Sequence, residues 1–181
     1  MATLAVTCRS GGVLGIVTPL ALAAAAGTAL VVDLDADGPR YPGDSSLAEL
    51  VRQGPRLADL RPTRDGIAVL RNGGITAAAA HEVVVALVAG WPCTVLRMPP
   101  DAEGISGPIV PVVPLLPGGM TPVSDRPAAY QQMGWHEDAP GPGVTLPTPS
   151  RRAVGALLEG RMPLWSRWIA AWTRVWEAPW V

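Results

Sequence analysis

The chain has 181 residues, enough for one domain with a substantial core, and its formal net charge is −1. A charge this close to zero gives the whole chain no attraction to polyanions, so a nucleic-acid partner is not expected. All 14 basic residues are arginine, and the 2 cysteines do not have the spacing of a disulfide framework or a zinc site. We therefore expect a cytoplasmic chain without a structural metal.

The start of the chain has the layout strand, glycine turn, helix, strand. The predicted elements are a strand at Leu4–Cys8, a turn containing Gly11, Gly12 and Gly15, a helix at Val17–Ala26 and a strand at Ala29–Leu34. Pro19 would fall in the first turn of this helix, where proline is tolerated, and Gly27 is placed to end it.

An export signal is the alternative for this region. The run from Val13 to Val32 approaches the length of a membrane span, and Val13 to Ala26 ends in small residues. However, Arg9 is the only charge ahead of the run, and glycines and a proline interrupt it. We prefer a buried strand–helix–strand unit.

The middle of the chain continues to alternate. We predict a helix capped by Ser46 and ending near Arg52, a strand at Gly66–Leu70, a helix from Thr76 to Val88 and strands at Cys93–Arg97 and Ile109–Leu116. Glu49 completes a capping box with Ser46. Ile109–Leu116 contains prolines and is expected at an edge of the sheet, because proline cannot donate to a strand ladder.

The last third holds more glycine and proline. Residues 117–149 are predicted to be mostly loop, with a short helix near Pro127–Met133 and a short strand at Val144–Leu146. Ser150 is expected to cap a helix to Leu158, and 164–177 to form a final amphipathic helix. Residues 1–181 are thus predicted to be a single α/β domain of three layers, a doubly wound, mostly parallel sheet with helices on both faces.

The glycine turn has the shape of a phosphate-binding loop but lacks its charge. In such loops, backbone amides at a helix N-terminus bind phosphate, a lysine neutralises it, and a Ser or Thr hydroxyl reaches the magnesium. Gly11, Gly12 and Gly15 provide the bend, but the chain contains no lysine. Arginine is a poor replacement, because its planar fork differs from a compact ammonium.

This layout resembles the MinD/ParA family of deviant Walker ATPases. The family motif runs strand, Lys-Gly-Gly-x-Gly-Lys-Thr, helix, then a strand ending Asp-x-Asp. The turn here reads Ser10-Gly11-Gly12-Val13-Leu14-Gly15-Ile16, and the strand ends Asp33-Leu34-Asp35. The likeness is specific over residues 4–38 and weaker beyond them, where Thr94–Pro100 is similar to the Walker B strand and its proline-containing end.

The resemblance fails at the catalytic positions. Ser10 stands where the family has its signature lysine, Leu14 replaces a glycine, Gly15 replaces the second lysine, Ile16 the magnesium-binding hydroxyl and Arg97 the Walker B aspartate. Neutralisation of phosphate charge supplies most of the catalysis in such enzymes. We therefore expect a pseudo-ATPase without a cofactor, and a divergent ATPase using ATP and magnesium is the alternative.

Two interpretations are open for the aspartates. By resemblance, Asp33 and Asp35 correspond to the magnesium-linked and water-orienting acids of the family. Without a lysine beside them, we prefer a structural role in which they cap the loop that follows the strand, where Asp37-Gly38-Pro39 indicates a turn.

The C-terminal segment is rich in tryptophan. Trp165, Trp168, Trp172 and Trp176 recur at helical spacing and form one face of the predicted helix. That face can pack in the core, bind a protein partner or second copy, or lie on a membrane surface. MinD proteins carry a C-terminal membrane-binding helix, so the resemblance adds a peripheral position at the inner membrane face. The predicted partners are a protein or a homo-oligomer, in septum placement, pilus or secretion assembly, or segregation.

Overall fold

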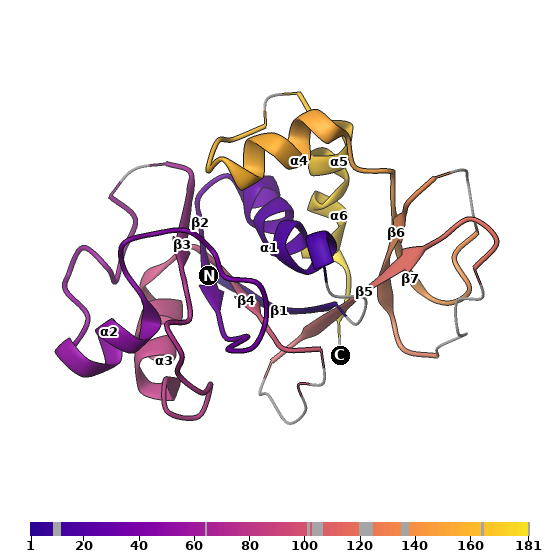
Figure 1. Cartoon of the computed structure of the whole chain (residues 1–181). Coiled ribbons are helices and arrows are strands. Elements are labelled where there is room, and N and C mark those ends of the chain that lie inside the picture. Colours follow the sequence, from indigo (N-terminus) through magenta and orange to yellow (C-terminus); the bar gives the residue numbers. More distant parts are fainter. Residues whose placement is uncertain are drawn as a thin grey trace.

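Seven parallel strands form one sheet in the order β3-β2-β4-β1-β5-β6-β7 in the computed structural model (Figure 1). The structure describes residues 1–8, 12–63, 65–100, 102, 107–119, 125–134, 138–163 and 165–180. The strands are β1 (Ala2–Cys8), β2 (Ala29–Asp33), β3 (Ile67–Leu70), β4 (Cys93–Arg97), β5 (Ile109–Leu115), β6 (Ala128–Gln132) and β7 (Gly143–Leu146). The helices are α1 (Gly12–Ala26), α2 (Leu47–Gln53), α3 (His81–Gly90), α4 (Arg151–Leu158), α5 (Arg167–Ala171) and α6 (Thr173–Glu177).

The sheet separates two apolar cores. Leu4 and Val6 of β1 pack with α1, α4, α5 and α6 on one face, whereas Ala5 packs with α2 and α3 on the other. This alternation is the period-two pattern of a strand that is covered on both faces. The predicted three-layer α/β fold is confirmed.

Helix α1 is longer than predicted, because it starts at Gly12 rather than Val17. Pro19 therefore lies inside the helix and not in its first turn, so that part of the prediction is wrong. Around the proline, the Thr18 hydroxyl donates to the Leu14 carbonyl at 2.8 Å, and the Tyr41 hydroxyl donates to the Ile16 carbonyl at 2.8 Å. Side chains thus supply hydrogen bonds to carbonyls in the part of the helix that proline disturbs.

The apolar run from Val13 to Val32 is not one continuous helix. It divides into α1 and β2, and Gly27 separates them with a φ of +82°. Within the described parts of the chain, no helix is both long and apolar enough to cross a membrane. The buried strand–helix–strand unit is confirmed.

Two predictions for the β5–β6 region are wrong. β5 is not an edge strand, since it lies between β1 and β6, where Pro111 is in register with Thr7 and Pro114 with Gln131. The amides of a parallel strand alternate between its two neighbours, so each proline removes one bond and leaves the rest of both ladders intact. Residues 127–133 contain β6, a buried strand, rather than a short helix, because pairing with β5 and β7 overrides local helix propensity.

The remaining elements follow the sequence closely. Ser46 and Glu49 form the predicted capping box of α2, and the Ser150 side chain caps α4. Helix α3 starts at His81, later than predicted, although the Thr76 hydroxyl does accept from the Ala79 amide. The predicted C-terminal helix is divided into α5 and α6 at Trp172.

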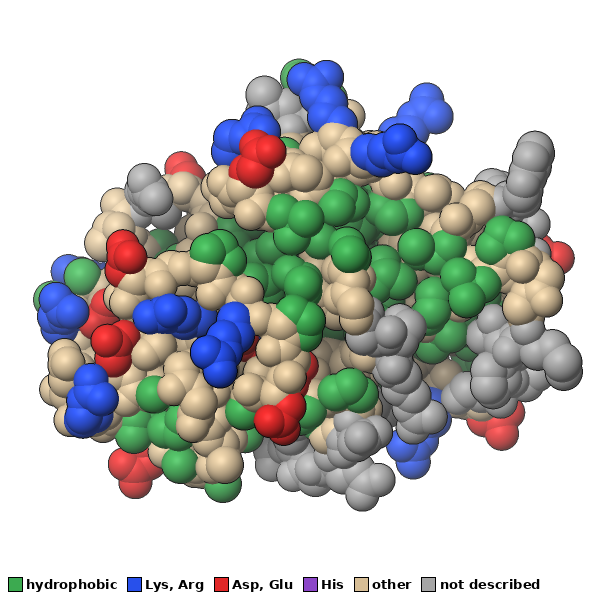
Figure 2. Space-filling view, viewed as in Figure 1, with side chains coloured by type: hydrophobic (Ala, Val, Ile, Leu, Met, Phe, Trp, Pro, Cys, Tyr) green, Lys and Arg blue, Asp and Glu red, His purple; other side chains and the backbone are tan. Residues whose placement is uncertain are grey.

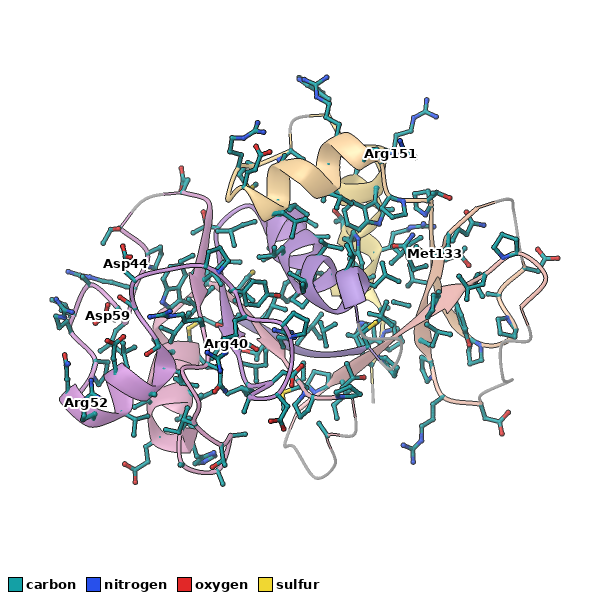
Figure 3. The ribbon with its side chains drawn as sticks, in the orientation of Figure 1. Arg40, Asp44, Arg52, Asp59, Met133 and Arg151 are labelled. Carbon is teal, nitrogen blue, oxygen red and sulfur yellow. The ribbon has the colours of Figure 1, made fainter. Side chains whose placement is uncertain are left out.

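Charged side chains lie mainly at the periphery. Arg52, Asp44 and Arg151 are exposed, and Figure 3 shows Arg52 and Arg151 at opposite margins of the molecule. In Figure 2, apolar side chains gather over α1 and toward β6 and β7, with arginines above them over α4. A buried arginine in this molecule therefore calls for an explanation.

Candidate functional site at the carboxyl ends of β1, β2 and β4

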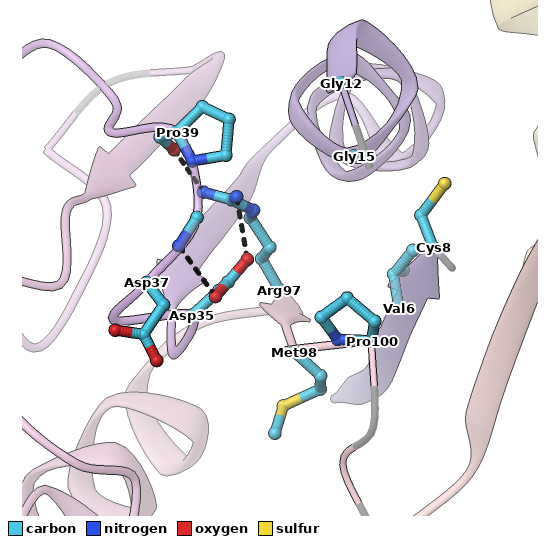
Figure 4. A pocket seen from close by; sticks show the side chains of 11 residues that line it. Val6, Cys8, Gly12, Gly15, Asp35, Asp37, Pro39, Arg97, Met98 and Pro100 are labelled. Atoms are coloured by element: carbon cyan, nitrogen blue, oxygen red, sulfur yellow. Dashed lines mark hydrogen bonds and ion pairs between the residues drawn. The ribbon is translucent and has the colours of Figure 1, made fainter. Parts of the chain in front are cut away.

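Strands β2, β4 and β1 are neighbours, and their carboxyl ends meet at one edge of the sheet next to the start of α1 (Figure 1). Ligands of parallel α/β sheets usually bind at this edge. A cavity of about 240 Å³ lies here. Its walls are formed by Val6, Cys8, Gly12, Gly15, Asp35, Asp37, Gly38, Pro39, Arg97, Met98 and Pro100 (Figure 4).

Arg97, the last residue of β4, forms one wall of this cavity. Its register partner on β2 is Asp33, so the two side chains start from adjacent strands. Nη1 of Arg97 lies 3.2 Å from Oδ1 of Asp33 and donates to the Pro39 carbonyl at 2.7 Å, while Nη2 lies 3.0 Å from Oδ2 of Asp35. The side chain of Arg97 is only 3% exposed, and its guanidinium carbon lies 5.2 Å from the centre of the Tyr41 ring. We call Arg97, Asp33, Asp35 and Tyr41 the acid–arginine cluster.

The two aspartates also hold the loop that follows β2. Oδ1 of Asp33 accepts from the Asp35 amide at 3.1 Å, and Oδ1 of Asp35 accepts from the Gly38 amide at 2.9 Å. A Cβ on Gly38 would overlap the side chains of both Asp35 and Arg97, so the loop needs glycine there. The predicted loop-capping role of the aspartates is confirmed.

Burial changes the protonation of the cluster. Removal from water raises the pKa of Asp33 from 3.8 to about 6, although the positive charge of Arg97 and the Asp35 amide oppose the rise. Burial also raises the pKa of Tyr41, so its phenol stays neutral. Asp33 is therefore mostly ionised at pH 7 and mostly protonated at pH 5.

The structure describes only part of the predicted phosphate loop. Ser10 and Gly11 lie outside the described residues. Gly12 opens α1 with a φ of +60°, a left-handed conformation that suits glycine, and Gly15 borders the same cavity with open space where a Cβ would be. Gly12, Gly15 and Asp35 therefore meet at one cavity.

The hydroxyl of Thr18, one turn further along α1, is buried and donates to the Leu14 carbonyl. Within the described residues, no group of three or more His, Cys, Asp or Glu side chains is arranged to hold a metal ion. The cation that faces Asp33 and Asp35 is the guanidinium of Arg97.

Sequence reasoning noted Arg97 only as a missing aspartate and did not predict its ion pairs. The signal was present, because an arginine ends one apolar strand and two aspartates end another. A buried charge is tolerated only when it is paired. The sequence therefore made these opposite charges candidates for pairing, but only the strand order shows that β2 and β4 are neighbours.

The tryptophans of the C-terminal segment occupy different environments. Trp168 and Trp172 are 2% and 0% exposed and meet edge to face, with ring centres 6.4 Å apart. The Trp168 indole donates to Oε1 of Gln131 at 2.7 Å, and the partly buried Trp176 donates to the Leu22 carbonyl at 2.9 Å. Trp165 is fully exposed. For Trp168 and Trp172 the structure therefore favours the core alternative, whereas Trp165 exposes its whole ring.

Comparison with protein-family models gives no match, and comparison with curated proteins gives none either. The likeness to the MinD/ParA family therefore stays a resemblance carried by residues 4–38. The structure itself shows a parallel α/β sheet with helices on both faces.

Proposed function

We propose that this chain is a non-catalytic, pseudo-ATPase protein of MinD/ParA-like layout that acts by binding other proteins. The contexts that the resemblance suggests are septum placement, pilus or secretion assembly, and segregation. One observation carries the proposal: the guanidinium of Arg97 is bound to both Asp33 and Asp35.

The ion pairs oppose magnesium chemistry at this edge of the sheet. An ATPase of this layout needs cations around the phosphates and acids that are free to hold magnesium or orient water. Here a protein cation already bonds the two acids, so magnesium would have to displace Arg97. A buried guanidinium separated from its carboxylates is strongly unfavourable. The chain also has no lysine to neutralise a phosphate.

The alternative is a divergent ATPase that binds ATP and magnesium through an arginine. The cavity of about 240 Å³ favours it, because Gly12 and Gly15 form one side and Arg97 another. This alternative requires Arg97 to leave Asp33 and Asp35 and turn toward phosphate. The pseudo-ATPase and the divergent ATPase therefore differ in whether nucleotide separates Arg97 from Asp33 and Asp35.

A thermal titration with ATP and magnesium separates them. A site with low-micromolar affinity would stabilise the folded state by about 3–4 kcal/mol at millimolar ligand and raise the melting temperature clearly. We expect no magnesium-dependent shift. ATP with EDTA, and magnesium alone, control for effects of ionic strength; a shift that needs both ATP and magnesium would establish the alternative.

A further inference from the structure

A second feature, at the start of α5, is a tryptophan held out of the core. Trp165 is fully exposed and has a φ of +55°. It is the one non-glycine residue with positive φ among the residues that the structure describes. A bulky side chain in the left-handed region is uncommon and costs free energy, and such strain gathers at functional sites.

An open groove of about 430 Å³ lies beside this tryptophan. Ala24 and Ala25 from the end of α1, with Ile169 and Ala170 of α5, give it an apolar surface. Trp165 and Arg167 also border it, together with Pro163, Ser166 and Thr173. We call this feature the Trp165 groove.

Positive charge around the groove is not neutralised within the described chain. From Ser150 onward the sequence contains five arginines and two glutamates. Arg161 pairs with Glu159, and Arg174 donates to the Thr145 carbonyl. Arg167 is exposed and makes no ion pair with any other described residue. The groove thus joins an apolar surface to an unpaired guanidinium.

We propose that the Trp165 groove binds a segment of a protein partner that presents an apolar side chain flanked by carboxylates. This inference rests on the proposed function and names the class of partner. The apolar side chain would lie against Ala24, Ala25 and the Trp165 ring, and a carboxylate would pair with Arg167. Tryptophan and arginine are the residues that most often dominate protein interfaces.

The positions of the other tryptophans favour such a segment over a lipid surface. An interfacial helix needs a broad apolar face turned outward. Here Trp168 and Trp172 point into the core, which leaves Trp165 and a shallow, open groove. A single projecting ring beside a small apolar groove is not the broad apolar face that a bilayer requires, and it suits a short peptide better.

The test is selection from a displayed library of short random peptides on the whole folded chain, followed by affinity measurement with synthetic peptides. We expect enrichment of sequences with a Leu, Ile or Phe between acidic residues. Trp165→Ala should weaken the best peptide at least about tenfold. Arg167→Glu should weaken it several-fold, with a loss that shrinks at high salt. Replacement of the acids of that peptide by lysine should abolish binding.

Matched variants outside the Trp165 groove test whether the loss of peptide binding is specific to the groove. Leu57→Ala removes another exposed apolar side chain, and Arg52→Glu reverses another exposed arginine; both should bind the peptide like the natural chain. Trp165→Gly serves as a second groove variant, because glycine adopts the positive φ without strain and keeps the fold.

Several outcomes would overturn the inference. They are the absence of enriched peptides, enriched peptides that are neutral or basic, or binding that survives Trp165→Ala. Self-association in sedimentation that is lost in Trp165→Ala would assign the groove to a second copy of the chain. Pelleting with anionic vesicles that is lost in Trp165→Ala would assign it to lipid. The ATP titration is independent of the peptide measurements. Peptide binding together with a melting-temperature shift that needs ATP and magnesium would support the groove as a peptide site and reject the pseudo-ATPase.

Discussion

The acid–arginine cluster and the Trp165 groove both combine an arginine with an aromatic ring. The arginine is buried and ion-paired in the cluster, but exposed and without an ion pair among the described residues at the groove. In the cluster, Arg97 is 3% exposed and bonds two carboxylates of its own chain. At the groove, Arg167 is exposed and has no ion pair within the described chain, and Trp165 is fully exposed. The charges of the cluster are paired within the chain, whereas Arg167 at the groove has no ion-pair partner among the described residues.

A place at the ligand-binding edge of a parallel sheet therefore does not by itself leave polar groups free to bind a ligand. The cluster lies where parallel sheets usually bind ligands, yet its polar groups bond mainly to one another. The groove lies on the helical layer, at the end of α1 away from that edge, and its Arg167 has no ion pair among the described residues.

Removal of the arginine should have the largest effect. Arg97→Ala leaves two buried carboxylates without their cation, and we expect a loss of about 3–5 kcal/mol in the free energy of unfolding at pH 7. The loss should be smaller at pH 5, because protonation of Asp33 removes one of the uncompensated charges. Denaturant titrations at the two pH values measure this. Arg52→Ala is the matched control and should change stability by less than about 0.5 kcal/mol; equal effects for the two variants would contradict a cluster that stabilises the fold.

The tryptophans should divide into structural and exposed members. Trp172→Ala opens a large cavity against α1 and is expected to cost about 3–5 kcal/mol. Trp165→Ala should cost less than about 0.5 kcal/mol, since its ring is outside the core. Thermal and denaturant unfolding of the pair measures the difference. A large loss in Trp165→Ala would show that this ring packs in the native fold after all.

The free energy of unfolding should depend on pH through the titration of Asp33. The pKa of Asp33 is about 6 in the folded chain, whereas the pKa of an exposed aspartate is 3.8. The folded state therefore binds this proton more tightly, so its contribution to stability is full below about pH 4 and is lost as the pH rises through 6. Asp33→Asn cannot titrate, and the difference in unfolding free energy between the natural chain and this variant should change across that interval. A difference that stays constant from pH 4 to pH 7 would mean that the buried carboxyl is not perturbed.

The smallest expected effect concerns the backbone at Trp165. Trp165→Gly and Trp165→Ala both remove the ring, but only glycine adopts a φ of +55° without strain. The glycine variant should therefore be more stable than the alanine variant by up to about 1 kcal/mol. Differential scanning calorimetry resolves such a difference. If alanine proves the more stable, the left-handed conformation is not a constraint of the native groove.

Local sequence signals predicted most of the fold. The strands at Leu4–Cys8 and Cys93–Arg97 and the caps at Ser46 and Ser150 depend on short-range pattern and side-chain chemistry, and they were found. The errors at β5 and β6 arose because pairing with distant segments decides the structure there. Sheet pairing makes a strand of residues 128–132 and places the proline-containing β5 inside the sheet.

The candidate site was likewise predictable from the sequence only in part. Spacing along the chain associated the glycine turn with Asp33 and Asp35, and the structure brings Gly12, Gly15 and Asp35 to one cavity. The pairing of Asp33 with Arg97 joins residues far apart in sequence and depends on β2 and β4 being neighbours, so local pattern alone does not give it. Helical spacing also predicted one shared face for four tryptophans, but it could not show that Trp165 falls before α5 and leaves that face. The four are Trp165, Trp168, Trp172 and Trp176.

The most direct test of the central claim follows the Arg97 guanidinium by ¹⁵N NMR during a titration with ATP and magnesium. Assignment comes from the loss of the signals in Arg97→Ala or, if that variant does not fold, in Arg97→Gln. The account predicts side-chain N–H signals protected from solvent by the bonds to Asp33 and Asp35, unchanged at millimolar nucleotide. Signals that move or lose protection only when ATP and magnesium are both present would show that Arg97 leaves its aspartates for phosphate, and would contradict the pseudo-ATPase.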